Sequence, residues 1–117
     1  MTRNRTRFGY GAGLAVAAVS LTMLTAAPAT AASDSWYRDC RVDSKYTAEL
    51  SAHVATTKKS GGSCEGHAYV RIMVDGKWGT WGSGSKEATR RSPVYRIEKS
   101  QHKDCNCSTA NVITLTR

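Results

Sequence analysis

The chain is short and basic, with 117 residues, 17 lysines and arginines against 9 acidic residues, a formal net charge of +8 and four cysteines. This length excludes a large multidomain protein and leaves room for one small domain. No basic helix or RNA-binding motif accompanies the charge, which argues against nucleic acid as a partner.

Residues 1–31 have the pattern of an export signal. Three arginines and no acidic residue precede an apolar run at 14–24, which is shorter than the roughly 20 residues that span a bilayer. Small residues follow, and we expect cleavage after Ala31, with Ala32 as the alternative. No cysteine lies at the cut and no second apolar run follows, so we expect a secreted, extracellular protein without a membrane anchor, 86 residues long and carrying a net charge of +5.

Residues 32–39, "ASDSWYRD", show no clear period and predict an extended N-terminal arm before the first cysteine. The arm carries Trp36, Tyr37 and Arg38, residue types that are enriched in the energetic centres of protein interfaces. They are therefore candidate partner-binding residues. The alternative is that Trp36 folds back onto the domain and caps its core.

Residues 40–117 predict a single all-β domain, a small antiparallel β-sandwich or open barrel of about five strands. Strict alternation predicts one half-buried strand over 45–57, followed by a polar loop at 58–63. Further strands are expected at 67–74, 77–81, 94–99 and 111–117, with a long polar loop at 82–92. Asp75-Gly76 is a strong signal for a two-residue hairpin turn, because a type I′ turn needs positive φ at both positions.

That hairpin turn sets a register between the strands at 67–74 and 77–81. Val74 then opposes Lys77, Met73 opposes Trp78 and Val70 opposes Trp81, and directly opposed side chains share a face. Trp81 is therefore expected inside and Trp78 outside. The expected core consists of Tyr46, Ala48, Leu50, Ala52, Val54, Val70, Ile72, Val74, Trp81, Tyr95, Ile97, Ile113 and Leu115.

The opposite face of the same hairpin carries Tyr69, Arg71, Met73 and Trp78. An exposed aromatic and basic patch of this kind marks a candidate binding site. The alternative is a second packed face, covered by another strand or by the N-terminal arm.

The four cysteines, Cys40, Cys64, Cys105 and Cys107, indicate two disulfides in a small exported chain. Four cysteines allow three connectivities, and proximity in sequence favours Cys40–Cys64 with Cys105–Cys107. A zinc site built from the cysteines with His67 and His102 is the rival interpretation. Export argues against it because oxidation competes for the thiols, so we expect no metal and no cofactor.

Catalysis has one candidate constellation, His53 with Glu49 and Ser51 on the polar face of the first predicted strand. An activated nucleophile also needs an oxyanion hole and a pocket, and no motif indicates either. Ordinary alternation of polar surface residues accounts for the same three side chains. We therefore expect no catalytic residues and no enzyme.

The layout as a whole resembles that of small exported β-proteins of actinomycetes: an alanine-rich signal, a short all-β mature chain and two disulfides. Enzyme inhibitors share it, and so do adaptor subunits of umbrella-shaped toxin particles, although the tryptophan-arginine-tyrosine triplet of the amylase inhibitors is absent. The adaptor resemblance implies that an N-terminal arm, here residues 32–39, enters the cleft of a partner. We therefore expect a secreted protein-binding module, either an adaptor in an extracellular, antibacterial toxin complex or an inhibitor. The alternatives are a module that binds cell-wall polymer or glycan, and a small secreted enzyme or toxin.

Overall fold

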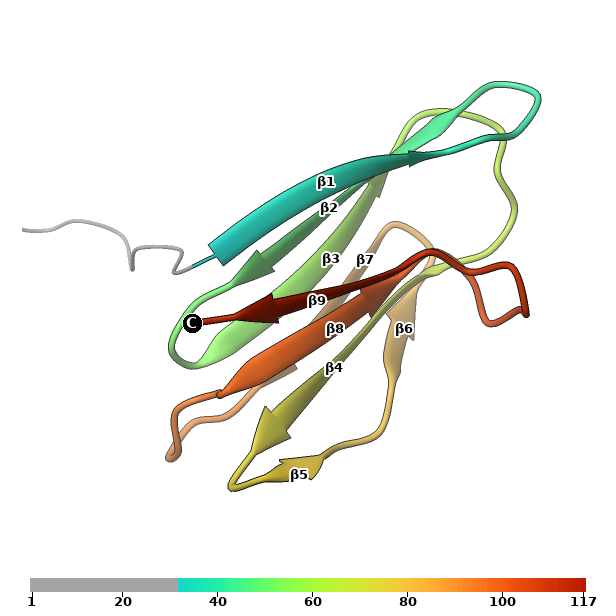
Figure 1. The fold of residues 1–117 in the computed structure, drawn as a ribbon. Coiled ribbons are helices and arrows are strands. Elements are labelled where there is room, and N and C mark those ends of the chain that lie inside the picture. The colour runs from blue at the N-terminus through green and yellow to red at the C-terminus, as the bar shows by residue number, and fades with distance from the viewer. Residues whose placement is uncertain (1–31) are drawn as a thin grey trace, which may run out of the picture.

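The computed structural model describes residues 32–117; the expected signal peptide, residues 1–31, lies outside this range. The described chain is all-β, with nine strands in two antiparallel sheets and no helix (Figure 1). The predicted fold class is confirmed, although the number of strands is nine rather than about five. Within 32–117 there is accordingly no apolar helix of bilayer-spanning length.

The first sheet has four strands in the order β1-β2-β3-β7. They are β1 (Ala32–Arg38), β2 (Ser44–Leu50), β3 (Val54–Ser60) and β7 (Glu87–Arg91). All seven residues of β1 pair with β2. The segment expected to be an arm is therefore extended, but it forms an edge strand of the domain.

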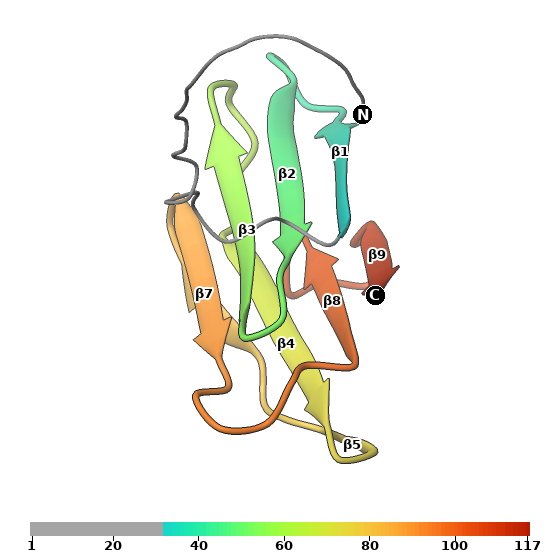
Figure 2. The same ribbon diagram turned by 90° about the vertical axis from the view of Figure 1, so that its left-hand side faces the viewer.

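The second sheet has five strands, four in the order β5-β4-β8-β9, with β6 also paired to β4. They are β4 (Ala68–Val74), β5 (Lys77–Trp78), β6 (Gly82–Gly84), β8 (Lys99–Lys103) and β9 (Val112–Thr116). Figures 1 and 2 show the two sheets as separate layers facing each other. The core lies between them, so each sheet has one inner and one outer face.

The predicted strand at 45–57 is wrong, because a turn at residues 51–53 divides it into β2 and β3. Tyr46, Ala48 and Leu50 are buried as expected, but after the turn Ala55 and Thr57 point inward instead of Ala52 and Val54, which are only half-buried. The three turn residues include no glycine or proline, and they continue the alternation of polar and apolar residues. The sequence pattern therefore gave no sign that the chain reverses direction here.

The predicted strand at 94–99 and the loop at 82–92 are also misplaced. Residues 87–91 form β7, and residues 92–98 form the loop that leads to β8. Tyr95 is 67% exposed rather than a core residue, whereas Ile97 is buried as expected. The remaining expected core residues except Trp81 are buried or pack against the buried cluster: Val70, Ile72, Val74, Ile113 and Leu115.

Both predicted disulfides are confirmed, Cys40–Cys64 and Cys105–Cys107. The Cys40–Cys64 bridge joins the β1–β2 connection to the β3–β4 connection. All four cysteines are disulfide-bonded, so none is available as a thiolate ligand for zinc. Two disulfides are consistent with an extracellular or secreted protein.

Candidate functional site

The Asp75-Gly76 turn has the predicted geometry. The φ angles are +53° at Asp75 and +74° at Gly76, the positive pair that a type I′ turn requires. The register beside it is also as predicted, with Val74 opposite Lys77 and Met73 opposite Trp78. Trp78 therefore lies on the outer face of the second sheet.

The register changes by one residue beyond Trp78. In β6, Gly82 and not Trp81 opposes Val70, so one extra residue lies between the two paired segments. A one-residue shift moves every following side chain to the other face of the sheet. The prediction that Trp81 lies in the core is therefore wrong; it lies on the outer face together with Trp78.

Arg90 of β7 stabilises this bulge from the other sheet. Its Nη2 donates hydrogen bonds to the carbonyl oxygen of Trp81 at 3.1 Å and to Thr80 Oγ1 at 3.4 Å. A Cβ atom at Gly82 would lie only 2.8 Å from Arg90 Nε. The glycine thus leaves space for the arginine, and the arginine holds the backbone that presents Trp81 outward.

Five side chains on this outer face form an alternating series of rings and cations, the cation–aromatic ladder: Trp78, Arg71, Trp81, Lys103 and Tyr69. Arg71 Cζ lies 4.7 Å from the ring centroid of Trp78 and 4.7 Å from that of Trp81. Lys103 Nζ lies 4.2 Å from the ring centroid of Trp81 and 5.3 Å from that of Tyr69. Each cation therefore contacts two rings, within the range at which cation–π attraction operates.

The ladder includes three of the four residues expected in this patch, Tyr69, Arg71 and Trp78. The fourth, Met73, is paired with Trp78 and is half-buried on the same face. The sequence did not predict Trp81 on this face, because the bulge shifts the register by one residue. It did not predict Lys103 there either, because β8 shows no alternation of apolar residues. The pairing of Tyr69 with Lys103 places Lys103 on this face, a position that the misassigned strand at 94–99 did not provide.

The charge of this face is of one sign. The outward-facing positions of β4, β8 and β9 include Arg71, Lys99 and Lys103 and no acidic residue. Comparison of the chain with protein-family models, with curated proteins and with solved structures finds no match. A function for the face has to be inferred from its contacts and its charge.

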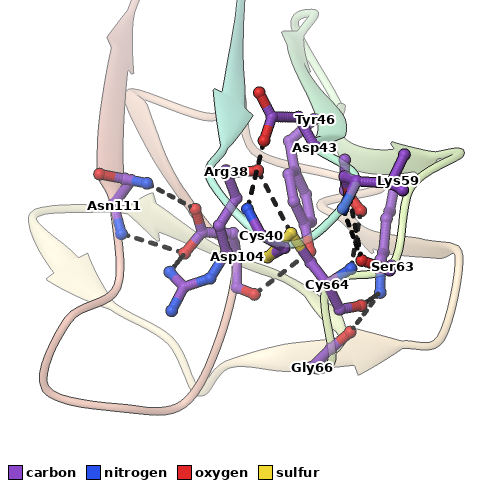
Figure 3. The surroundings of a disulfide bond; sticks show 12 residues. Arg38, Cys40, Asp43, Tyr46, Lys59, Ser63, Cys64, Gly66, Asp104 and Asn111 are labelled. Atoms are coloured by element: carbon purple, nitrogen blue, oxygen red, sulfur yellow. Dashed lines mark hydrogen bonds and ion pairs between the residues drawn. A yellow bond between two sulfur atoms is a disulfide. The ribbon is translucent and has the colours of Figure 1, made fainter.

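Two candidate residues of the N-terminal segment, Trp36 and Arg38, contact the buried carboxylate of Asp104, and Figure 3 shows Arg38 and Asn111 beside it. Trp36 Nε1 donates to Asp104 Oδ2 at 2.9 Å, and Arg38 Nη1 donates to Oδ1 at 2.8 Å. Asn111 donates to both oxygens, through its backbone N–H at 3.0 Å and its Nδ2 at 2.8 Å. The Trp36 ring also stacks on Tyr46 at 5.5 Å. Four hydrogen bonds satisfy the carboxylate, and Trp36 and Arg38 hold the domain together.

Tyr37 is the one candidate of that segment that points into solvent, with 63% of its surface exposed. It alternates with Trp36 and Arg38 along β1, so its side chain lies on the opposite face of the strand. The three residues therefore do not form a single contact surface.

A serine–histidine pair lies between the sheets and includes His102, which the sequence indicated only as a zinc ligand of the rival interpretation. The Thr57 hydroxyl donates to the carbonyl oxygen of Tyr69 at 2.8 Å, so it accepts from His102 Nδ1 at 2.7 Å. His102 Nε2 then accepts from the Ser100 hydroxyl at 2.6 Å. Ser100 and His102 are both completely buried, so substrate has no access to them. Burial lowers the pKa of His102 to about 4, which keeps the ring neutral.

The candidate catalytic constellation of the first predicted strand, which the sequence did not favour, does not form. Ser51 and His53 lie in the turn between β2 and β3, and the hydroxyl of Ser51 donates to Val54 O at 3.1 Å. His53 Nδ1 lies 2.7 Å from Ser92 O, and Glu49 lies 3.7 Å from Lys58 Nζ. Each of the three has a separate local partner.

A hollow of about 320 Å³ is lined by residues that do not belong to the ladder: Lys59, Gly61, Gly62, Ser85 and Lys86. Lys59 Nζ donates to the carbonyl oxygens of Cys64 at 2.6 Å and Gly66 at 2.9 Å. The lysine therefore fixes the loop before β4 rather than presenting a cation to a ligand.

Proposed function

We propose that this chain is a secreted, non-enzymatic protein-binding module, an adaptor or inhibitor in an extracellular complex, and that the cation–aromatic ladder is its contact surface. The observation that carries the proposal is the ladder itself, two tryptophans and a tyrosine alternating with two cations on one face of the sheet. The expected export signal and the two disulfides support the secreted location.

The composition of the ladder favours a protein partner. Tryptophan, tyrosine and arginine are the residue types that dominate binding energy in protein interfaces. Here their side chains are already held against one another, so association would immobilise few additional rotamers. All five are half-buried in the free domain and retain surface for a partner.

A glycan ligand is less well supported by the same geometry. Sugar rings stack on open aromatic faces, but Trp81 contacts both cations of the ladder, and Trp78 and Tyr69 each contact one. Each of the three rings is therefore already in contact with at least one cation. This arrangement suits polar and charged groups better than it suits stacked sugar.

Capture of a partner from the culture medium in which the protein is made tests the proposal. Immobilised wild-type protein is expected to retain a secreted protein. Washing with 0.5 M salt should release that protein, because salt at this concentration screens charges beyond roughly 4 Å. The double variant Trp78→Ala, Trp81→Ala is expected to lose it, because interface tryptophans are frequent hot spots. Tyr37→Ala, which removes an exposed ring from the other sheet, is the matched control and should retain the partner.

Two outcomes would contradict this function. The first is equal retention of the same protein by the double variant and by wild type. The second is retention of the wild-type chain on purified cell-wall polymer with no secreted protein bound, which would support the glycan-binding alternative. Circular dichroism and thermal unfolding of both variants establish that they remain folded.

A further inference from the structure

The guanidinium of Arg71 is held in one orientation by side chains on three sides. The rings of Trp78 and Trp81 flank it, and its Nε donates to Gln101 Oε1 at 2.8 Å. Gln101 is itself positioned by a hydrogen bond from its Nε2 to Thr114 Oγ1 at 3.2 Å. Four strands or connections, β4, the β5–β6 segment, β8 and β9, thus fix this one cation.

The outer edge of this guanidinium has no partner within residues 32–117. Its only hydrogen bond in this range uses Nε, and neither of the two ion pairs of the described chain includes it. The two terminal nitrogens therefore retain the fork of N–H donors that matches a carboxylate in bidentate fashion. A surface arginine normally loses rotamer freedom when it binds an anion, whereas here the domain has already fixed it.

Lys103 provides a second cation at a defined spacing. Both Lys103 and Arg71 lie against the Trp81 ring, and Lys103 pairs with Tyr69, two residues before Arg71 on the same face of β4. Arg71 and Lys103 are thus diagonal neighbours on adjacent strands, whose same-face positions lie about 7–8 Å apart. An extended peptide repeats its own same-face side chains at a similar interval, about 6.6–6.8 Å, so carboxylates two residues apart on a peptide that crosses from β4 to β8 meet both cations.

From these contacts we infer that the ladder is a receptor for an extended acidic protein segment, with one carboxylate bound to Arg71 and a second, two residues away, bound to Lys103. This inference rests on the proposed function and specifies the chemistry of the partner. The absence of acidic residues at the outward positions of β4, β8 and β9 makes the face complementary to such a segment. A carboxylate is flat and lies in the guanidinium plane, whereas a phosphodiester is tetrahedral and projects oxygens toward the flanking rings.

The test is a titration of the purified, oxidised full chain with blocked synthetic peptides, followed by tryptophan fluorescence and by calorimetry. One peptide alternates glutamate and threonine; the other has the same composition with its glutamates adjacent. The alternating peptide is expected to bind more tightly. Arg71→Gln should weaken that binding roughly 10- to 100-fold, because it removes a pair of hydrogen bonds to a charged group.

Matched variants distinguish the effect of the bidentate guanidinium of Arg71 from the effect of positive charge alone. Lys45→Gln removes one exposed positive charge from β2, on the other sheet, and should leave binding unchanged. Arg71→Lys keeps the charge without the planar fork and should lose most of the effect. Gln101→Ala removes the group that positions Arg71 and should weaken binding less than Arg71→Gln does.

Equal affinity of Arg71→Gln and Lys45→Gln for the alternating peptide would overturn the inference, as would equal affinity of the two peptides for wild type. Tighter binding of inorganic polyphosphate than of the alternating peptide would also overturn it. If Arg71→Gln does not fold, Arg71→Lys and Gln101→Ala still provide the comparison. The peptide titration needs no native partner. The ladder could therefore capture a secreted protein and still not bind the acidic peptide, a result that would contradict this inference but not the proposed function.

Discussion

Replacing Asp104 by alanine is expected to destabilise the domain by about 3–5 kcal/mol, because it leaves the half-buried guanidinium of Arg38 without its counter-ion. The indole N–H of Trp36 and both donors of Asn111 lose their acceptor in the same change. A domain of this size has only about 5–15 kcal/mol of stability in total. Urea unfolding of the oxidised protein, followed by tryptophan fluorescence, measures the difference.

Asp34→Ala is the matched control for that experiment. Asp34 is exposed on β1, and its carboxylate accepts one hydrogen bond, from Ser35 N at 2.8 Å. Its removal should change stability by about 0.5 kcal/mol or less. An equal loss of stability in Asp104→Ala and Asp34→Ala would contradict the structural role of Asp104.

A milder variant keeps the Asp104 prediction testable if the alanine variant does not fold. Asn111→Ala retains the carboxylate and Arg38 and removes only the Nδ2 hydrogen bond of 2.8 Å. It should cost about 1–2 kcal/mol. A double-mutant cycle between Arg38→Ala and Asp104→Ala should be strongly non-additive, because the two residues share one ion pair.

The stability of the domain is expected to fall by about 2 kcal/mol between pH 7 and pH 5 because of His102 alone. Burial lowers the pKa of His102 from 6.5 to about 4, so the unfolded chain binds a proton in this window while the folded chain does not. Proton uptake by the unfolded state favours unfolding as the pH falls. The loss approaches about 3 kcal/mol below pH 4, and the contribution is fully present above pH 6.5.

Urea unfolding at several pH values, on wild type and on His102→Asn, tests this dependence. The variant loses the hydrogen bonds to Thr57 and Ser100 and should be less stable at pH 7, but its stability should change by about 2 kcal/mol less between pH 7 and pH 5. His67→Gln, which removes an exposed imidazole, should retain the contribution of His102. An unchanged pH dependence in His102→Asn would contradict a neutral buried histidine. NMR titration of the His102 ring in wild type measures its pKa directly.

Local patterns in the sequence predicted the features whose causes are local. The Asp75-Gly76 turn and the register beside it depend on two adjacent residues that accept positive φ. The inward positions of β4 follow from simple alternation, and both disulfides follow from proximity along the chain. The all-β class follows from several short strands separated by turns.

The missed features depend on interactions between distant residues. The bulge that turns Trp81 outward is held by Arg90, from a strand that the sequence did not predict. The strand β8 has a polar sequence because its inward residues, Ser100 and His102, bond to each other and to Thr57 rather than packing as apolar side chains. No window of neighbouring residues contains these contacts, so periodicity alone predicted neither β8 nor the full cation–aromatic ladder.

The Asp104 cluster has a consequence for the order in which the domain folds. Trp36 and Arg38 lie 68 and 66 residues from Asp104 in sequence. The pairing of β1 with β2 is local, but the side-chain contacts of β1 with Asp104 need nearly the whole chain, and contacts that close so long a loop form slowly. The first strand of the chain can therefore pair with β2 before the rest of the domain forms, but it gains its last side-chain contacts only when residue 104 is in place.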